Sequence, residues 1–208
     1  MTYTPKLLQS YPIISDQVDR QELEVLLSAL EQQLQRQVTG SVVEFGCYIG
    51  TTSLFIRRML NAYSYSGQFH VYDSFAGLPA KSSQDSSPAG EQFTAGALAV
   101  SKKDFSLQFK KASLQLPTIH KCWFEQLGRS DVPADIMFAF LDGDYYSSIR
   151  DSLRLITPNL ASNATIIVDD YSSEALPGVA RATDEWLKAL PRARCRVEAS
   201  LAIIDLPG

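Results

Sequence analysis

Apolar residues recur along this chain in short continuous runs that alternate with stretches of helical spacing. The runs predict strands at these positions: Ser41–Phe45, Gln68–Tyr72, Ile119–Phe124, Ile136–Leu141 and Thr165–Val168. Strands that are apolar nearly throughout are typical of a parallel sheet covered on both faces. Between the runs, apolar residues three and four positions apart predict helices near 52–62, 102–116 and 147–157. This alternation predicts a doubly wound α/β fold with right-handed crossovers.

A further helix is predicted before the first strand. Asp19 and Glu22 have the spacing of a capping box, and the leucines of the segment 23–34 follow with helical spacing. Gly40 lies just past this segment, where a residue in the left-handed conformation often closes a helix. Residues 1–18 are polar, and no regular element is predicted for them.

The end of the chain predicts one more helix and a hairpin. Pro177 is expected near the first position of the helix, because a proline lacks the N–H that would be unpaired there. The runs Cys195–Ala199 and Leu201–Leu206 have almost nothing between them, which favours an antiparallel hairpin. We therefore predict a helical N-terminal segment, residues 1–40, followed by an α/β domain over residues 41–208.

The composition argues against several classes of function. The 208 residues include 19 basic and 23 acidic side chains, a formal charge of −4, so neither nucleic acid nor an anionic membrane is an expected partner. Three cysteines without a CxxC pair and two histidines argue against a zinc site. Neither a signal peptide nor a membrane-spanning apolar run is seen, and a cytoplasmic location is expected.

Two glycines four residues apart follow the first predicted strand, where ligands bind in open α/β sheets. Gly46 and Gly50 allow a tight turn and a close backbone approach, and the Thr-Thr-Ser run after them can cap the next helix and donate hydrogen bonds. Tyr48 stands where the dinucleotide fingerprint GxGxxG has its second glycine, so a pyrophosphate is not the expected ligand. A simple tight turn is the structural alternative.

The end of the second predicted strand adds a carboxylate to this glycine loop. Asp73 lies 27 residues beyond Gly46, at a position where a carboxylate can accept hydrogen bonds from both ribose hydroxyls. The combination favours nucleoside binding over a helix cap or a turn. The following segment, from Ser74 to about Gly96, is rich in Ser, Ala, Gly and Pro and is expected to be disordered or mobile. It is either a lid or binding loop or a solvated insertion.

The fourth and fifth predicted strands both end in acidic residues. Asp142 and Asp144 follow one strand, and Asp169 and Asp170 follow the other. Because neighbouring strands lie about 4.8 Å apart, four carboxylates would converge at one rim, where their repulsion is costly unless a cation neutralises it. Oxygen ligands without thiols suit Mg²⁺, Ca²⁺ or Mn²⁺. Separate helix caps facing water are the alternative.

Taken in order, the motifs VEFGCYIGTTS, VYDSFAGLP, CWFEQL, LDGDYYSS, IIVDDY and PGVARATDEW resemble those of the macrocin-type O-methyltransferases. Members of that family use S-adenosylmethionine and a metal ion to methylate sugar hydroxyls of macrolide and aminocoumarin antibiotics. The resemblance covers roughly residues 40–190. It implies the seven-stranded methyltransferase sheet, whose terminal antiparallel hairpin agrees with the one predicted above.

The resemblance also implies roles for individual residues, matched position by position. The methionine part of S-adenosylmethionine would be held by Glu44, Gly46, Gly50, Thr51, Thr52 and Ser53. The nucleoside would be held by Asp73 and Ser74 at the ribose and by Trp123 and Phe124 beside the adenine. The acidic residues would comprise the ligands of Mg²⁺ or another divalent cation, Asp142, Asp169 and Asp170, and the general base, Asp144. Asp142 is counted with the catalytic and the cofactor-binding residues as well.

The implied reaction is an in-line methyl transfer to a hydroxyl of a small molecule, expected to be a sugar of a natural product. One alternative, a nicotinamide-dependent oxidoreductase, requires GxGxxG and a catalytic Tyr-Lys or His pair, and neither is found. A second, a non-catalytic binding subunit, predicts eroded metal carboxylates. A third, a methyltransferase of catechols or other aromatic diols, uses the same metal geometry and stays open. A homo-oligomer also stays open, because the leucine-rich helix can pack on its own domain or on a second subunit.

Overall fold

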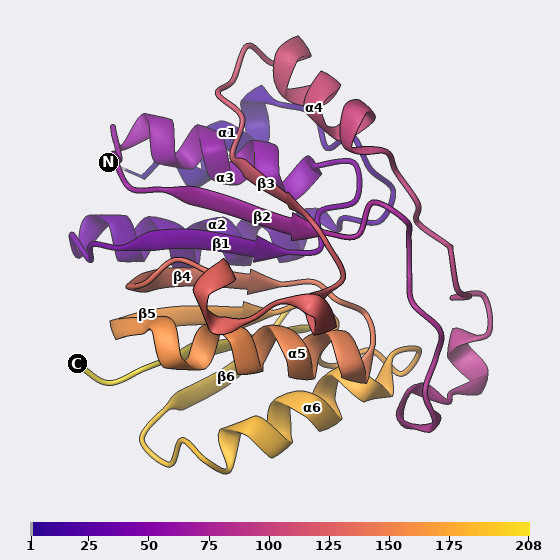
Figure 1. Cartoon of the computed structure of the whole chain (residues 1–208). Coiled ribbons are helices and arrows are strands. Elements are labelled where there is room, and N and C mark those ends of the chain that lie inside the picture. Colours follow the sequence, from indigo (N-terminus) through magenta and orange to yellow (C-terminus); the bar gives the residue numbers. More distant parts are fainter. Residues whose placement is uncertain (1) are drawn as a thin grey trace.

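The computed structural model describes residues 2–208, and in this part of the chain a sheet of seven strands lies between two layers of helices (Figure 1). The strands are β1 Ser41–Phe45, β2 Phe69–Asp73, β3 Thr118–Lys121, β4 Ile136–Leu141, β5 Leu160–Val168, β6 Arg194–Glu198 and β7 Leu201–Asp205. The α-helices are α1 Thr4–Ser10, α2 Arg20–Gln35, α3 Thr51–Ala62, α4 Lys102–Lys111, α5 Tyr146–Ile156 and α6 Pro177–Leu187. Short 3₁₀ turns are η1 Ser83–Asp85, η2 Pro88–Gly90, η3 Phe124–Gln126, η4 Arg129–Asp131 and η5 Thr157–Asn159.

The strand order confirms the predicted doubly wound sheet. It runs β3-β2-β1-β4-β5-β7-β6, with β1 to β5 parallel, β7 antiparallel to β5, and β6 antiparallel to β7. The chain moves outward from β1 to β3 and then returns to β4 on the other side of β1. This reversal leaves a crevice at the carboxyl ends of β1 and β4, where ligands bind in such sheets.

Helices cover both faces of the central strands, as their apolar sequences predict. On one face, α1 to α4 contribute to a core that includes Leu26, Phe55 and Phe140. On the other face, α5 and α6 contribute to a core that includes Leu141 and Ile149. No helix among residues 2–208 combines the length and the apolar character needed to cross a bilayer.

The N-terminal region differs from the prediction, because residues 4–10 form α1. The carboxylate of Glu31 in α2 accepts hydrogen bonds from the backbone N–H groups of Tyr3 and Thr4 and from the hydroxyls of Thr4 and Tyr63. This acceptor at the start of α1 satisfies N–H groups that a helix leaves unpaired. Seven residues are too few for a periodic apolar signal, so the sequence pattern did not reveal the helix. The division at residue 40 stays a prediction.

Two predicted helix ends were also wrong. The residue in the left-handed conformation after α2 is Gln37, with φ of 57°. Gly40 instead directly precedes β1, and a Cβ on Gly40 would lie 2.0 Å from the carbonyl oxygen of Asp135. The predicted helix over 102–116 stops at Lys111, because Ser113 has φ of 55°. Only Phe105 and Phe109 of α4 are buried, so its apolar face ends there.

The long segment between β2 and α4 has defined structure, although its composition predicted disorder or mobility. It passes the carboxyl ends of the strands, at the right of Figure 1, and includes η1 and η2. Leu78 donates its N–H to the carbonyl of Ala97, and Gly96 donates to the carbonyl of Leu78. Gly90 packs against Ala175, where a Cβ would meet the carbonyl oxygen at 2.1 Å. We call this segment, residues 74–101, the β2–α4 loop.

A carboxyl group lies inside the core at the centre of the sheet. Glu44 on β1 is fully buried, and its Oε2 accepts a hydrogen bond from the hydroxyl of Ser53 in α3, whereas its Oε1 has no partner among residues 2–208. Burial raises the pKa of Glu44 to about 8, against the opposing hydrogen bond from Ser53. The folded protein therefore holds this side chain as a neutral acid at neutral pH.

Replacing Glu44 with Gln tests this protonation state. The folded state keeps the proton of Glu44 up to about pH 8, whereas the unfolded chain loses it near the ordinary value of 4.5. The contribution of Glu44 to the free energy of unfolding is therefore present at low pH and falls as pH rises through this window, by up to about 1.4 kcal/mol per pH unit. Glu44→Gln removes this dependence, which is measured by urea unfolding at several pH values between 5 and 8.

The matched control is Glu24→Gln on the exposed face of α2, which leaves the buried carboxyl in place. Its stability should follow the pH dependence of the unmodified protein. Parallel pH profiles for the unmodified protein and Glu44→Gln would show that Glu44 is ionised in the folded state.

Candidate active site

A cavity of about 300 Å³ opens at the carboxyl ends of β1, β2, β4 and β5. It is lined by five parts of the chain: the glycine loop after β1, the end of β2 with the β2–α4 loop, the segment after β3, and the acidic ends of β4 and β5. Residues of the connection between α1 and α2 complete its wall. Its volume is in the range of pockets that take small organic ligands.

The glycine loop is shaped by contact between β1 and β4. Gly46 has φ of 87°, and a Cβ there would lie 1.8 Å from the carbonyl oxygen of Asp142, so only glycine fits. The chain then turns through Tyr48, a bulky residue with φ of 46°. Such a conformation is costly for a large side chain and is held by the surroundings. Gly46, Cys47 and Tyr48 all line the cavity.

Asp73 holds the glycine loop in place. Its Oδ2 accepts hydrogen bonds from the N–H groups of Cys47 at 2.8 Å and Tyr48 at 3.3 Å, and its Oδ1 accepts from Phe75 at 2.6 Å. A carboxylate offers about four acceptor positions, so one is left for a ligand in the cavity. Asp73 and Ser74 both line the cavity, where the sequence predicted a ribose site.

Several residues predicted at the methionine part of the cofactor do not line the cavity. Gly50, with φ of 92°, packs on the ring of Phe105, and a Cβ there would lie 2.8 Å from it. The buried residues beneath the glycine loop are Glu44, Thr51, Thr52 and Ser53. The N-cap of α3 is Gly50 without a side-chain hydrogen bond, so the expected cap by the Thr-Thr-Ser run is wrong. Ser53 uses its hydroxyl on Glu44 instead.

Two aromatic residues line the cavity after β3, as predicted for an adenine site. The strand itself ends at Lys121, earlier than the predicted Phe124, and Trp123 and Phe124 lie at the start of η3. Both side chains are partly buried, and the ring of Phe124 stands edge-on to Phe45 with centroids 5.2 Å apart. This leaves aromatic surface facing the cavity.

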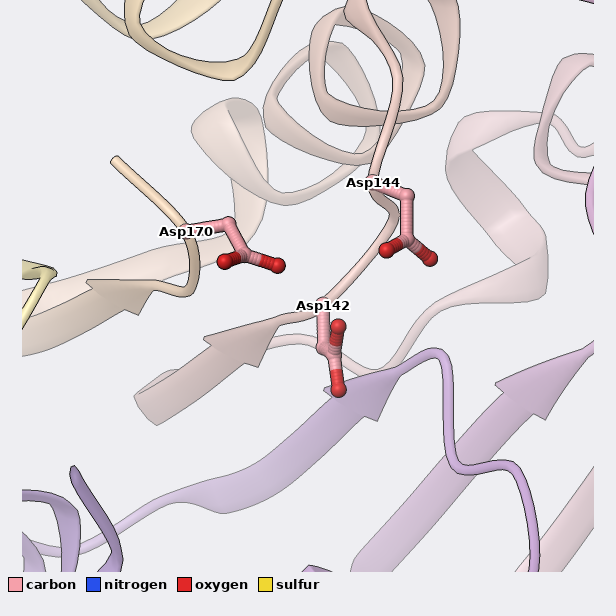
Figure 2. Close-up of side chains that lie close together, drawn as sticks. All are labelled: Asp142, Asp144 and Asp170. Atoms are coloured by element: carbon pink, nitrogen blue, oxygen red, sulfur yellow. The ribbon is translucent and has the colours of Figure 1, made fainter. Parts of the chain in front are cut away.

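Three aspartates meet at the ends of β4 and β5 (Figure 2). One carboxylate oxygen of each of Asp142, Asp144 and Asp170 lies within 4.8 Å of the others. Asp144 and Asp170 adopt the left-handed conformation, with φ of 60° and 54°, which places their side chains toward Asp142. Asp is among the few residues that tolerate this conformation. None of the ion pairs within residues 2–208 involves these carboxylates.

Crowding and burial change how these carboxyls titrate. Burial, then Asp169 and Asp144, raises the pKa of Asp142 well above its ordinary value. Burial, then Asp170 and Asp73, raises the pKa of Asp144 to about 7. The pKa of Asp170 is raised by burial. Hard cations prefer carboxylate oxygens, and a cation here would relieve the repulsion, so the donor set fits a divalent metal ion.

Asp169, the third predicted metal ligand, lies beside this cluster and is not part of the three. Its Oδ1 accepts the N–H of Asp170 at 3.0 Å. It lines the cavity and also a small crevice near Glu22 at the start of α2. Burial, then Asp170 and Glu22, raises its pKa well above the ordinary value. Asp169 therefore adds a fourth acidic group at the same edge.

The cavity also includes residues that sequence reasoning missed. They come from the α1–α2 connection and the β2–α4 loop: Asp16, Gln17, Gly77, Leu78, Pro79, Phe93 and Leu98. Ser148 in the first turn of α5 is a further one. The lid-or-binding-loop interpretation of the segment after β2 was the one signal that pointed to part of this set. The α1–α2 connection carries no comparable signal.

Comparison with known proteins identifies the family. The family described as macrocin O-methyltransferase (TylF) matches residues 11–208. A tetracenomycin rhamnosyl 4′-O-methyltransferase of Streptomyces olivaceus is 28% identical over 180 residues, 82% of this chain and 69% of the relative. The demethyldecarbamoylnovobiocin O-methyltransferase of Streptomyces niveus is 28% identical over 195 residues, 89% of this chain and 71% of the relative.

Solved structures show the same fold. The O-methyltransferase NovP superposes with a TM-score of 0.77 at 22% identity, over 89% of this chain and 79% of that one. The calicheamicin methyltransferase CalS11 gives 0.72 at 20% identity, over 97% and 89%. The chain therefore belongs to the macrocin O-methyltransferase (TylF) family and is an S-adenosylmethionine-dependent O-methyltransferase.

Proposed function

We propose that the chain methylates a hydroxyl group on the sugar of a natural product, with the help of a divalent cation at the acidic cluster. The carrying observation is that Asp142, Asp144 and Asp170 converge in the same cavity as the glycine loop and Asp73. Relatives support the acceptor class: one is described as a tetracenomycin rhamnosyl 4′-O-methyltransferase and another as the mycinamicin III 3″-O-methyltransferase of Micromonospora griseorubida.

The β1–β2 half of the cavity suits the cofactor. S-adenosylmethionine carries a methyl group on a positively charged sulfur. A nucleophilic oxygen attacks the carbon of this methyl group, and the carbon–sulfur bond breaks to release S-adenosylhomocysteine. Asp73 has an acceptor position left for a ribose hydroxyl, and Trp123 and Phe124 offer aromatic surface for an adenine. Gly46 lets the backbone approach closely. The buried Glu44 and Ser53 support this loop from below, without reaching the cavity.

The β4–β5 half suits the metal ion and the acceptor. The proposed ligands are Asp142, Asp169 and Asp170, and a divalent cation bound there would act as a Lewis acid that lowers the pKa of the acceptor hydroxyl. Asp144 lies in the same cluster and takes the hydroxyl proton.

An acceptor panel tests the substrate class. Purified protein with S-adenosylmethionine and Mg²⁺ is offered TDP-rhamnose, mycinamicin III, demethyldecarbamoylnovobiocin and catechol, and S-adenosylhomocysteine is quantified. We expect at least one sugar acceptor to be methylated, at a rate roughly tenfold or more above catechol, because a site built for sugar hydroxyls discriminates strongly. Turnover of catechol alone would show that the acceptor class is aromatic diols and not sugars.

Calorimetric titration of Mg²⁺ or Mn²⁺ into chelator-treated protein tests the metal site. We expect one binding isotherm that is lost in Asp170→Ala and in Asp169→Ala, because each removes a proposed carboxylate ligand. The affinity for S-adenosylmethionine should change less than about twofold, since these residues lie on the other half of the cavity. The control Asp104→Asn alters an exposed aspartate at the start of α4 and should bind the metal normally. Unchanged metal binding in both alanine variants would exclude Asp169 and Asp170 as metal ligands.

Asp144→Asn tests the proposed base. The amide keeps the size of the side chain but cannot accept the proton, so kcat should fall about 10²- to 10⁴-fold, the usual contribution of a general base. Titrations should still show binding of S-adenosylmethionine and of the metal ion. An unchanged kcat with the best acceptor of the panel would exclude Asp144 as the base.

A further inference from the structure

Asp85 is a fully buried carboxylate in the β2–α4 loop, outside the set of cavity-lining residues. Its Oδ2 accepts hydrogen bonds from the N–H of Ser82 at 3.0 Å and from the Ser82 hydroxyl at 2.6 Å, and its Oδ1 accepts from the N–H of Tyr146 at 2.6 Å. None of the ion pairs within residues 2–208 includes it. A buried charge is costly unless donors compensate it, and these three N–H and O–H groups do so.

The contact with Tyr146 places Asp85 at the start of α5. Tyr146 is the first residue of this 11-residue helix, and its N-cap, Tyr145, contributes no side-chain hydrogen bond. The first N–H groups of a helix are unpaired and carry a partial positive charge. Asp85 therefore supplies from a distant segment the cap that α5 lacks in its own sequence. The capped residue, Tyr146, lies two residues after Asp144.

Gly178 shows that the structure makes room for this carboxylate. It lies in the first turn of α6, and a Cβ there would lie 1.9 Å from Oδ1 of Asp85 and 2.8 Å from the N–H nitrogen of Tyr146. Any larger residue would displace one of the two. The β2–α4 loop, α5 and α6 thus meet at a single buried carboxylate.

A second contact ties the same two segments together. The hydroxyl of Tyr145, the residue between Asp144 and Tyr146, donates to the carbonyl of Phe93 at 3.0 Å. Phe93, together with Leu78 on the same loop, walls the cavity. The loop that encloses the cavity and the segment that carries Asp144 are therefore held against each other.

We propose that Asp85 is a positioning residue: by capping α5 it fixes the backbone that holds Asp144 in its left-handed conformation and joins it to the cavity wall. The inference rests on the proposed role of Asp144 as the base. Asp85 does not line the cavity in which substrate and cofactor are proposed to bind. It acts on the rate through the placement of Asp144, and misplacement of a reacting group by about 1 Å costs on the order of 10²-fold.

Hydrogen exchange of the whole protein provides a test that needs no acceptor. Asp85→Ala should speed exchange both in a peptide covering 80–91 and in a peptide covering 142–148, because both ends of the contact are freed. The matched control, Ser82→Ala, removes the loop-side hydroxyl and leaves the bond to Tyr146, so only the 80–91 peptide should change. Unchanged exchange of 142–148 in Asp85→Ala would overturn the proposal.

Kinetics with the best acceptor of the panel then separates positioning from general destabilisation. Asp85→Ala should lower kcat roughly 10- to 100-fold. The KM for S-adenosylmethionine should stay within about twofold, since the cofactor half of the cavity is untouched. The kcat of Ser82→Ala should stay within about twofold of the kcat of the unmodified protein. In the Asp144→Asn background, Asp85→Ala should add less than about a twofold loss, because the residue it positions is already inactive. Fully additive losses would mean that Asp85 acts elsewhere.

Two further variants keep the test decisive if Asp85→Ala does not fold. Asp85→Asn retains an oxygen for the N–H of Tyr146 and should show the smaller loss of kcat. Gly178→Ala removes no donor or acceptor but pushes a methyl group into the carboxylate, and it should reproduce the loss of kcat and the faster exchange of 142–148. If Asp144→Asn itself leaves kcat unchanged, the proposed base fails, while the exchange data still decide whether Asp85 holds the segment.

Discussion

Repulsion among four carboxylates at the ends of β4 and β5 is the constraint around which this molecule is arranged. Asp142, Asp144 and Asp170 bring oxygens within 4.8 Å of one another, and Asp169 lies beside them. Like charges at such distances, partly withdrawn from water, oppose folding and raise each other's pKa. The arrangement persists only because the surrounding structure determines it, and backbone strain of this kind gathers at functional sites. Two of the three clustered aspartates sit in the left-handed conformation.

The surrounding structure supplies that support through backbone contacts. Gly46 allows β1 to lie against the carbonyl of Asp142 with no side chain between them. At the ends of β1 and β2, Asp73 accepts two hydrogen bonds from the glycine loop and one from Phe75 in the β2–α4 loop, which leaves one acceptor position toward the cavity. At the ends of β4 and β5, Asp85 accepts a hydrogen bond from the first N–H group of α5 and caps that helix. Each half of the cavity thus has one carboxylate, Asp73 or Asp85, whose hydrogen bonds order the neighbouring backbone.

The pattern of the sequence predicted those parts of the fold that local physics determines. Ser41–Phe45 and Ile136–Leu141 form strands with the predicted bounds, because runs that are apolar nearly throughout are buried favourably between two helical layers. The acidic edge was predicted from the acidic residues that follow the fourth and fifth strands, and the pairing of β4 with β5 confirms that these strands are neighbours. What depends on contacts between distant segments was missed: α1, which Glu31 caps, and the placement of Asp16 in the cavity wall. Composition also misjudged the β2–α4 loop, whose order rests on single buried contacts such as that of Asp85.

The same electrostatics links function to stability. A carboxyl whose pKa is raised in the folded state binds its proton more tightly there than in the unfolded chain, so its contribution to stability falls as pH rises through the gap between the two values. Asp142, Asp144, Asp169 and Asp170 all titrate in this direction. At neutral pH the cluster therefore weakens the fold it belongs to. A cation that binds only the folded arrangement stabilises it by mass action. The repulsion among the carboxylates that destabilises the fold is therefore also what gives this edge of the sheet its affinity for a positively charged ligand.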